Sequence, residues 1–263
     1  MDEQTAPAET YDDPAAEAAV EPSSGAPVEE RIVHALDRTV GHAVERAAAH
    51  VPDPVKPRLR GWLHLAAAPV AAVGGLVLIL LARGDGEVAS VVVYAVATTL
   101  LFTVSATYHL GRWSPRVHGV LKRFDHANIF LLIAGTYTPF TVILLENGRR
   151  TALLWIVWAA AVAGVAFRVL WVGAPRWLYV PAYVLLGWTA VFFLPDFAHA
   201  AGAAVLVLLV LGGAFYTVGG TVYALRRPDP FPTWFGYHEV FHTFTLLGYL
   251  AQYVGVLIVV VTR

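Results

Sequence analysis

The feature that most constrains the fold is a series of long apolar segments between residue 62 and the end of the sequence. Each segment approaches the ~20 residues that an α-helix needs to cross the hydrocarbon core of a bilayer. We therefore expect seven membrane-spanning helices, at about 62–82, 88–109, 124–145, 151–171, 177–195, 200–224 and 237–261. The fifth and sixth are separated only by Pro195-Asp196-Phe197, for which we expect a tight turn.

The overall composition supports this interpretation. Hydrophobic residues make up 57% of the chain and charged residues only 14%, whereas roughly 25% of the residues of an ordinary soluble domain are charged. The sequence therefore predicts an all-α membrane protein, built as a bundle of seven transmembrane helices.

The chain before the first apolar segment divides into two regions. Residues 1–27 are rich in Ala, Glu, Pro and Ser, so we expect a disordered acidic tail. Residues 28–54 are expected to form an amphipathic interfacial helix and a linker, because apolar side chains recur every four residues. This helix could instead pack against the membrane domain, but positive charges just before the first span favour a position on the membrane surface. Residues 55–263 would form the membrane domain.

The Lys and Arg residues of the short loops predict the orientation. Ten of them lie on the same side of the membrane as the N-terminus, and four lie on the opposite side. This bias places the N-terminus in the cytoplasm and, with seven spans, the C-terminus outside. We expect a multi-pass protein of the plasma (inner) membrane, whose partners are the bilayer and its lipids and not nucleic acid.

Two histidines open the seventh predicted span. His238 and His242 are four residues apart, so on a helix their Cβ atoms lie about 5–6 Å from each other on one face. Zinc–nitrogen bonds are about 2.0–2.1 Å long, and two imidazoles at this spacing can bind one ion. The chain has no cysteine, so any metal must be held by histidine, carboxylate or water.

The predicted orientation brings further polar residues to the same cytoplasmic half of the membrane. His109 ends the second span, Ser105 lies one turn before it, and Asp125 begins the third span. Ionisable groups at membrane depth are costly and ordinarily mark function. From the residues alone, this convergence leaves two interpretations open, a shared metal site and separate polar side chains at helix ends. Single histidines near helix ends are more often interfacial anchors, which is how we interpret His64, His118, His126 and His199.

The stretch from His238 to His242 also matches the zinc-protease pattern His-Glu-x-x-His, in which the glutamate, here Glu239, activates a metal-bound water. Five residues form a short motif. Intramembrane members of that class would carry an Asp ligand in a separate Asp-Gly segment, and the one candidate, Asp85-Gly86, falls on the opposite side of the membrane. An intramembrane metalloprotease is therefore a minor alternative.

At these residues the chain resembles the haemolysin III family and, through it, the progestin and adiponectin receptor (PAQR) group and the alkaline ceramidases. The similar stretches are Gly61–His64, Ser105–Leu110, Phe124–Pro139 and Trp234–Gly248. The resemblance covers about residues 55–262. It rests on Ser-x-x-x-His, a following Asp and His-x-x-x-His, which occur in that order on the predicted spans.

The resemblance implies a zinc ion bound by His109, His238 and His242. It also implies that Asp125 holds the zinc-bound water and that Ser105 supports the site. Adiponectin receptors carry Gln where this chain has Glu239, whereas the haemolysin III branch commonly has Glu. Whether Asp125 or Glu239 would be the catalytic base therefore stays open.

The function that we expect is zinc-dependent hydrolysis of a lipid amide or ester near the cytoplasmic face. The competing class is a non-enzymatic, lipid-responsive membrane regulator in which a structural zinc joins the second, third and seventh helices. A third arrangement is an iron site of His238, His242 and Asp125, which would leave His109 without a role.

Overall fold

A computed structural model describes residues 27–28 and 56–263 of the chain. The predicted acidic tail and interfacial helix lie outside the described residues, apart from Pro27 and Val28. Residues 55–263 form one compact unit, and its described part consists of helices and the loops between them, with no strand between residues 56 and 263.

The helices agree closely with the predicted spans for most of the chain. Among the described residues, six segments are long and apolar enough to cross a membrane. The elements are α2 (Trp62–Leu81), α3 (Asp85–Leu110), α4 (Pro115–Leu144), α5 (Asn147–Leu170), α6 (Arg176–Gly187), the 3-10 helix η1 (Trp188–Phe193), α7 (Leu194–Leu225) and α8 (Tyr237–Thr262). The first residue of a helix differs most from its predicted position in α4. This helix begins at Pro115 because Ser114 caps it and proline fits the first helical turn.

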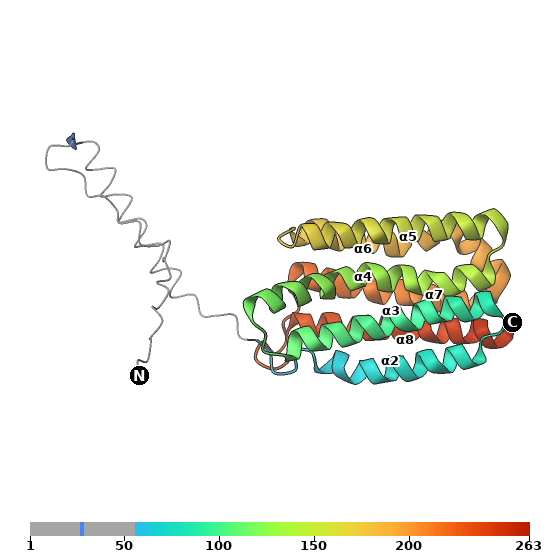
Figure 1. The fold of residues 1–263 in the computed structure, drawn as a ribbon, viewed down its shortest axis with the longest axis horizontal. Helices are drawn as coiled ribbons and strands as arrows, with labels where there is room; N and C mark the ends of the chain where they lie inside the picture. Colours follow the sequence, from blue (N-terminus) through green and yellow to red (C-terminus); the bar gives the residue numbers. More distant parts are fainter. Residues whose placement is uncertain (1–26, 29–55) are drawn as a thin grey trace, which may run out of the picture. The chain divides into compact units, whose positions relative to one another are not determined.

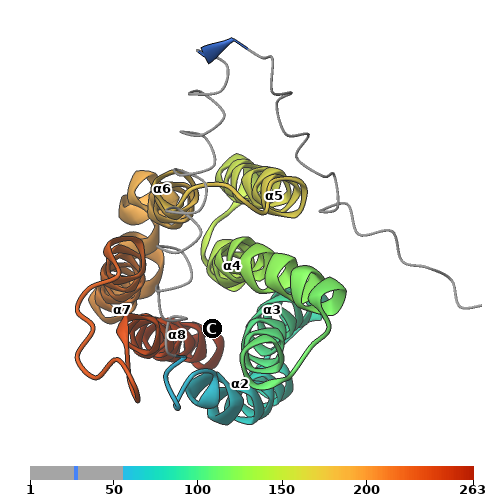
Figure 2. The same ribbon diagram turned by 90° about the vertical axis from the view of Figure 1, so that its left-hand side faces the viewer.

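The helices lie side by side with their long axes nearly parallel (Figure 1). Viewed along these axes, α2 to α8 follow one another around a ring, and α8 returns to lie beside α2 (Figure 2). We call the end of the bundle where α2, α4, α6 and α8 begin the proximal end, and the opposite end the distal end. The ring brings the first and last of these helices into contact.

The stretch from Arg176 to Leu225 folds back on itself. Arg176 Nη1 donates to the Tyr223 carbonyl at 2.9 Å, and Trp188 Nε1 donates to Thr217 Oγ1 at 2.8 Å. These contacts pair early residues with late ones in reverse order, so α6 and the later part of α7 run antiparallel.

The predicted tight turn within this stretch is wrong. Residues 195–197 are helical and open α7, since proline is tolerated in a first turn. The non-helical backbone lies instead at Gly202, with φ 76° and ψ 177°. This positive φ is readily adopted by glycine, which has no Cβ to clash. The signal for the break was therefore the glycine and not the proline.

Small residues let neighbouring helices approach closely in the membrane domain. A Cβ added at Gly75 would lie 2.5 Å from Ala95 Cβ, and one added at Gly164 would lie 2.4 Å from the Phe130 ring. These positions join α2 to α3 and α5 to α4. Such close approach of backbones is typical of helix packing in membranes.

The outward faces of the bundle carry large apolar side chains. Leu80, Trp155, Leu185 and Phe192 are among the most exposed of them. Soluble monomers rarely expose apolar surface of this extent. The described surface is therefore suited to contact with lipid.

Candidate metal site

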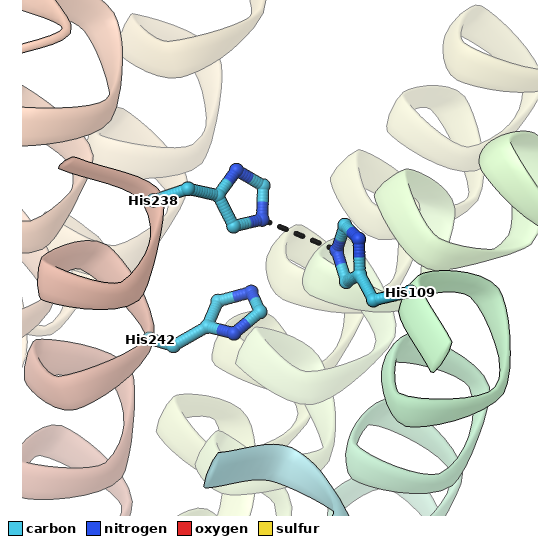
Figure 3. Close-up of side chains that lie close together, drawn as sticks. All are labelled: His109, His238 and His242. Atoms are coloured by element: carbon cyan, nitrogen blue, oxygen red, sulfur yellow. Dashed lines mark hydrogen bonds between the residues drawn. The ribbon is translucent and has the colours of Figure 1, made fainter. Parts of the chain in front are cut away.

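Three histidines meet at the proximal end of the bundle. His109 lies in the last turn of α3, and His238 and His242 lie on consecutive turns of α8 (Figure 3). One ring nitrogen from each lies within 4.8 Å of the others, and His109 Nε2 is 3.1 Å from His238 Nε2. We call these three residues the histidine cluster. It joins residues 129 positions apart in the sequence.

The geometry of the histidine cluster fits a metal ion. Two nitrogens bound to zinc at about 2.0–2.1 Å in a tetrahedral arrangement are about 3.3–3.4 Å apart, close to the His109–His238 separation. His242 Nδ1 is buried and has no hydrogen-bond partner among the described residues. Unpaired buried polar atoms are uncommon in folded proteins. The cluster could therefore hold a metal that favours imidazole ligands.

Asp125 lies next to the cluster and does not contact it directly. Its Oδ2 atom is 3.9 Å from His109 Nε2, beyond the length of a hydrogen bond but suited to a bridging water. Ser105, one turn before His109 on α3, is buried and lines the same cavity as Asp125. The structure thus brings both residues near the cluster.

Glu239 occupies a different position from Asp125. It is fully buried, and its carboxylate accepts hydrogen bonds from Arg60 Nε and from the backbone nitrogen of Gly236, the latter at 2.8 Å. The contact with Gly236 caps the start of α8. Both carboxylate oxygens are therefore occupied by structural contacts, and Glu239 does not line the cavity.

The interpretation of His64 as an interfacial anchor is wrong, because this residue is buried inside the bundle. It is only 2% exposed and its ring stacks on that of His242, with centroids 3.7 Å apart. Neither of its ring nitrogens has a partner among the described residues. The sequence held a usable signal, because His64 shares one face of α2 with the small residues Ala67, Ala71 and Gly75, all of which are buried.

The other three histidines differ from one another. His118 and His199 are exposed and agree with the anchor interpretation. His118 also lines the cavity. His126 lines it too but is only partly exposed, and its Nε2 lies 3.4 Å from the Tyr223 hydroxyl. Arg168 lies within a predicted span and also lines the cavity. A charge at that depth is a functional signal, which the motifs above do not include.

A cavity of about 1000 Å³ opens beside the histidine cluster. Its apolar lining includes Leu101, Leu132, Phe140, Phe197 and Leu209. Its cationic lining residues are Lys56, Arg60, Lys122, Arg168, Arg176 and Arg226, and Asp125 is the single carboxylate among the described lining residues. The cavity is therefore amphipathic, with cations near the cluster.

Lys56 and Arg60 precede α2 and lie over the cluster. Lys56 Nζ donates to the His109 carbonyl at 2.5 Å. Partial burial and, less strongly, the Arg60 guanidinium lower the pKa of Lys56. The chain segment before α2 is thus fixed to the end of α3 and, through Arg60, to the start of α8.

The fold and the site define a class: a multi-span helical membrane protein with a cluster of three histidines at one end of the bundle. The chain belongs to the haemolysin III family, because a model of that family, described as Haemolysin-III related, matches residues 53–253. It is 33% identical to the Hemolysin-3 homolog of Bacillus subtilis (strain 168) over 184 residues, 68% of this chain and 83% of that protein. It is also 33% identical to Hemolysin-3 of Bacillus cereus over 177 residues, 66% of this chain and 77% of that protein. The resemblance drawn from the motifs is confirmed.

Proposed function

We propose that the protein is a zinc-dependent hydrolase that acts on a lipid amide or ester near the cytoplasmic face of the membrane. One observation supports this most: the histidine cluster, with Asp125 beside it, opens into a large cavity with an apolar lining. An acyl chain would lie in the apolar part. The bond to be cleaved would lie at the cluster.

The residues of the chain would divide the chemistry as follows. Zinc held by three imidazoles with one open position would supply a Lewis acid that activates water and polarises a carbonyl. Asp125 would accept a proton from the attacking water and return it to the leaving amine or alcohol. Ser105 would hold Asp125 or the water by a hydrogen bond. Glu239 is a poorer base, because Arg60 and Gly236 occupy its carboxylate.

The same placement weighs against the alternatives. A protease of the His-Glu-x-x-His type needs its glutamate at the metal, and the contacts of Glu239 hold it elsewhere. An iron site without His109 is disfavoured, since His109 Nε2 is the atom that lies 3.1 Å from His238.

A non-catalytic zinc remains the second candidate, and one observation favours it. The cluster joins α3 to α8, and His64 of α2 stacks on His242, so a bound ion would fasten the first helices to the last. In that case the protein would be a lipid-responsive regulator. An exchangeable water at the metal would favour the enzyme, and Asp125 as a fourth ligand would favour the regulator.

The test is metal content and hydrolysis measured on the same purified sample. We expect about one zinc per chain in detergent and release of fatty acid from a short-chain ceramide or ester probe. Stoichiometric zinc with no hydrolysis of either probe, in detergent or in liposomes, would leave the structural role. Absence of zinc would refute both.

The proposed location depends on topology. We infer that the chain crosses the membrane seven times, because residues 176–225 form two antiparallel arms. The Lys/Arg bias puts the N-terminus and the proximal end in the cytoplasm. A reporter fused after Arg263 should be active only outside the cytoplasm. Activity inside would show that an arm of the 176–225 stretch does not cross.

A further inference from the structure

Arg168 is a buried cation without an acidic partner. It lies in the last turn of α5 and is 1% exposed. No Asp or Glu among residues 56–263 lies within salt-bridge distance of it. Burying an unpaired charge is costly, and arginines at membrane depth ordinarily pair with an anion or face a water-filled cavity.

The contacts of Arg168 satisfy only part of its guanidinium. Nη1 donates to the Trp171 carbonyl at 3.4 Å, and the guanidinium lies over the Tyr179 ring at 4.2 Å. Nε is buried and has no partner. Arginine carries five N–H donors in a planar fork. The contact with Trp171 is explained if Arg168 caps the end of α5. Capping does not explain why the Nε atom of Arg168 lacks a partner or why this residue lines the cavity.

A second arginine lines the same part of the cavity. The Arg176 guanidinium lies 4.5 Å over the Tyr223 ring and donates to the Tyr223 carbonyl. The Tyr179 hydroxyl donates to the Tyr223 hydroxyl at 3.3 Å, so a hydrogen bond joins the two residues beneath the arginines. We call Arg168, Arg176, Tyr179 and Tyr223 the arginine subsite. It offers two cations and two hydroxyls on one wall.

The arginine subsite and the histidine cluster are neighbours in the cavity. The Tyr223 ring contacts Arg176 on one side, and its centroid is 5.6 Å from that of His238. One aromatic ring therefore separates the two groups. A molecule whose carbonyl lies at the cluster would place a polar group a few bonds away at the arginines.

We propose that the arginine subsite binds the phosphate of an anionic lipid whose acyl chain lies in the apolar part of the cavity. Arginine matches phosphate oxygens through two parallel hydrogen bonds, and Arg168 has a buried Nε without a partner that such a contact would satisfy. Asp125 is the single carboxylate among the described lining residues, so the wall attracts anions. As a statement about substrate class this rests on the proposed function, but the binding itself does not require catalysis.

The test compares two lipids that differ in headgroup charge. Lysophosphatidylglycerol carries the phosphate, and the monoacylglycerol with the same acyl chain lacks it. Binding of each is titrated against the full chain in a neutral detergent. We expect the anionic lipid to bind about 10- to 100-fold more tightly, the range that a charged hydrogen bond supplies. Arg168→Gln should remove this preference, and Arg168→Lys should restore part of it.

Arg123→Gln is the matched control. Arg123 lies at the same end of the bundle and donates to the carbonyls of Gly119 and Val169, but it does not line the cavity. Its replacement should keep the preference for the anionic lipid. If Arg168→Gln fails to fold, Arg176→Gln carries the same expectation.

Competition by inorganic phosphate tests whether the ligand is a lipid headgroup or free phosphate. Under the proposal, millimolar phosphate competes weakly with the anionic lipid, because it lacks the acyl chain. Competition as strong as that of the lipid would overturn the lipid assignment and leave a free-phosphate site. Equal binding of the two lipids by the wild type, or an unchanged preference in Arg168→Gln, would refute the subsite. Zinc content and hydrolysis of a neutral probe, measured on the same samples, report separately on the proposed function.

Discussion

The bundle carries one arginine–carboxylate pair at each end, and the two pairs differ in their surroundings. At the proximal end, the side chains of Arg60 and Glu239 are 17% and 0% exposed. At the distal end, those of Arg149 and Asp196 are 55% and 30% exposed. The proximal pair lies beside a cavity with buried imidazoles, whereas the distal pair lies at the surface.

The two pairs show that polar groups at the proximal end lie at a candidate binding site, whereas those of the distal pair lie at a water-accessible surface. At the proximal end, His64, His242 and Arg168 are buried with polar atoms that have no partner among the described residues. Such groups are costly unless a ligand or ion completes them. The distal pair is accessible to water and has no such need. The predictions that follow test this contrast.

The largest effect is expected from loss of the histidine cluster. His109→Ala, His238→Ala and His242→Ala should each reduce bound zinc from about one per chain to near zero. Each should also lower the unfolding temperature in detergent, because metal binding is coupled to folding. The measurements are metal analysis and thermal unfolding.

The controls for this prediction are exposed histidines from both ends. His118→Ala, at the proximal end, and His199→Ala, at the distal end, should keep the zinc and the stability. Stoichiometric metal that survives His109→Ala, while His238 and His242 remain essential, would exclude the three-histidine site.

The next effect concerns Asp125. Asp125→Asn should keep most of the zinc, since the carboxylate does not contact the cluster directly. It should reduce hydrolysis by about 10²- to 10⁴-fold, the contribution typical of a general base. The rate and the zinc content are measured on one preparation. Full activity in this variant would return the role of base to Glu239.

The buried ion pair should have a moderate effect on stability. Glu239→Ala leaves Arg60 without its partner and removes the cap of α8, and breaking a buried pair costs up to about 3–5 kcal/mol. The partial exposure of Arg60 reduces that cost. We expect a clear decrease in the unfolding temperature. No decrease would mean that water at the proximal end replaces the carboxylate.

The smallest effect is expected at the distal end. Arg149→Gln should leave thermal unfolding and zinc content unchanged within error, because exposed ion pairs contribute little to stability. It is the direct counterpart of the Glu239 variant. A destabilisation as large as that of Glu239→Ala would contradict the contrast between the two ends.

Much of the fold could be predicted from the sequence, because a bilayer imposes simple rules on length and polarity. The spans agree with the helices except where backbone detail decides, as at Gly202. The histidine cluster could also be predicted from the sequence. His238 and His242 share a helical face, and the charge bias placed His109 at the same end.

Other parts of the site required the three-dimensional structure. Glu239 was a candidate base because it matches the His-Glu-x-x-His pattern, and its contact with Arg60, 179 positions away, could not be predicted from that pattern. The position of Arg168 within a predicted span is visible in the sequence, but its lack of an acidic partner among the described residues is not. Such long-range contacts leave no periodic pattern in the chain.

The contact of α8 with α2 and α3 also has a consequence for how the protein is made. His64 and His109 enter the membrane early in synthesis, but their partners on α8 emerge only after six earlier α-helices of the described bundle. A ribosome-bound intermediate that lacks α8 would hold at most one of the three imidazoles of the cluster. Metal loading would thus be a late step of biogenesis, and a chain that has acquired its ion is one whose ring of helices has already closed.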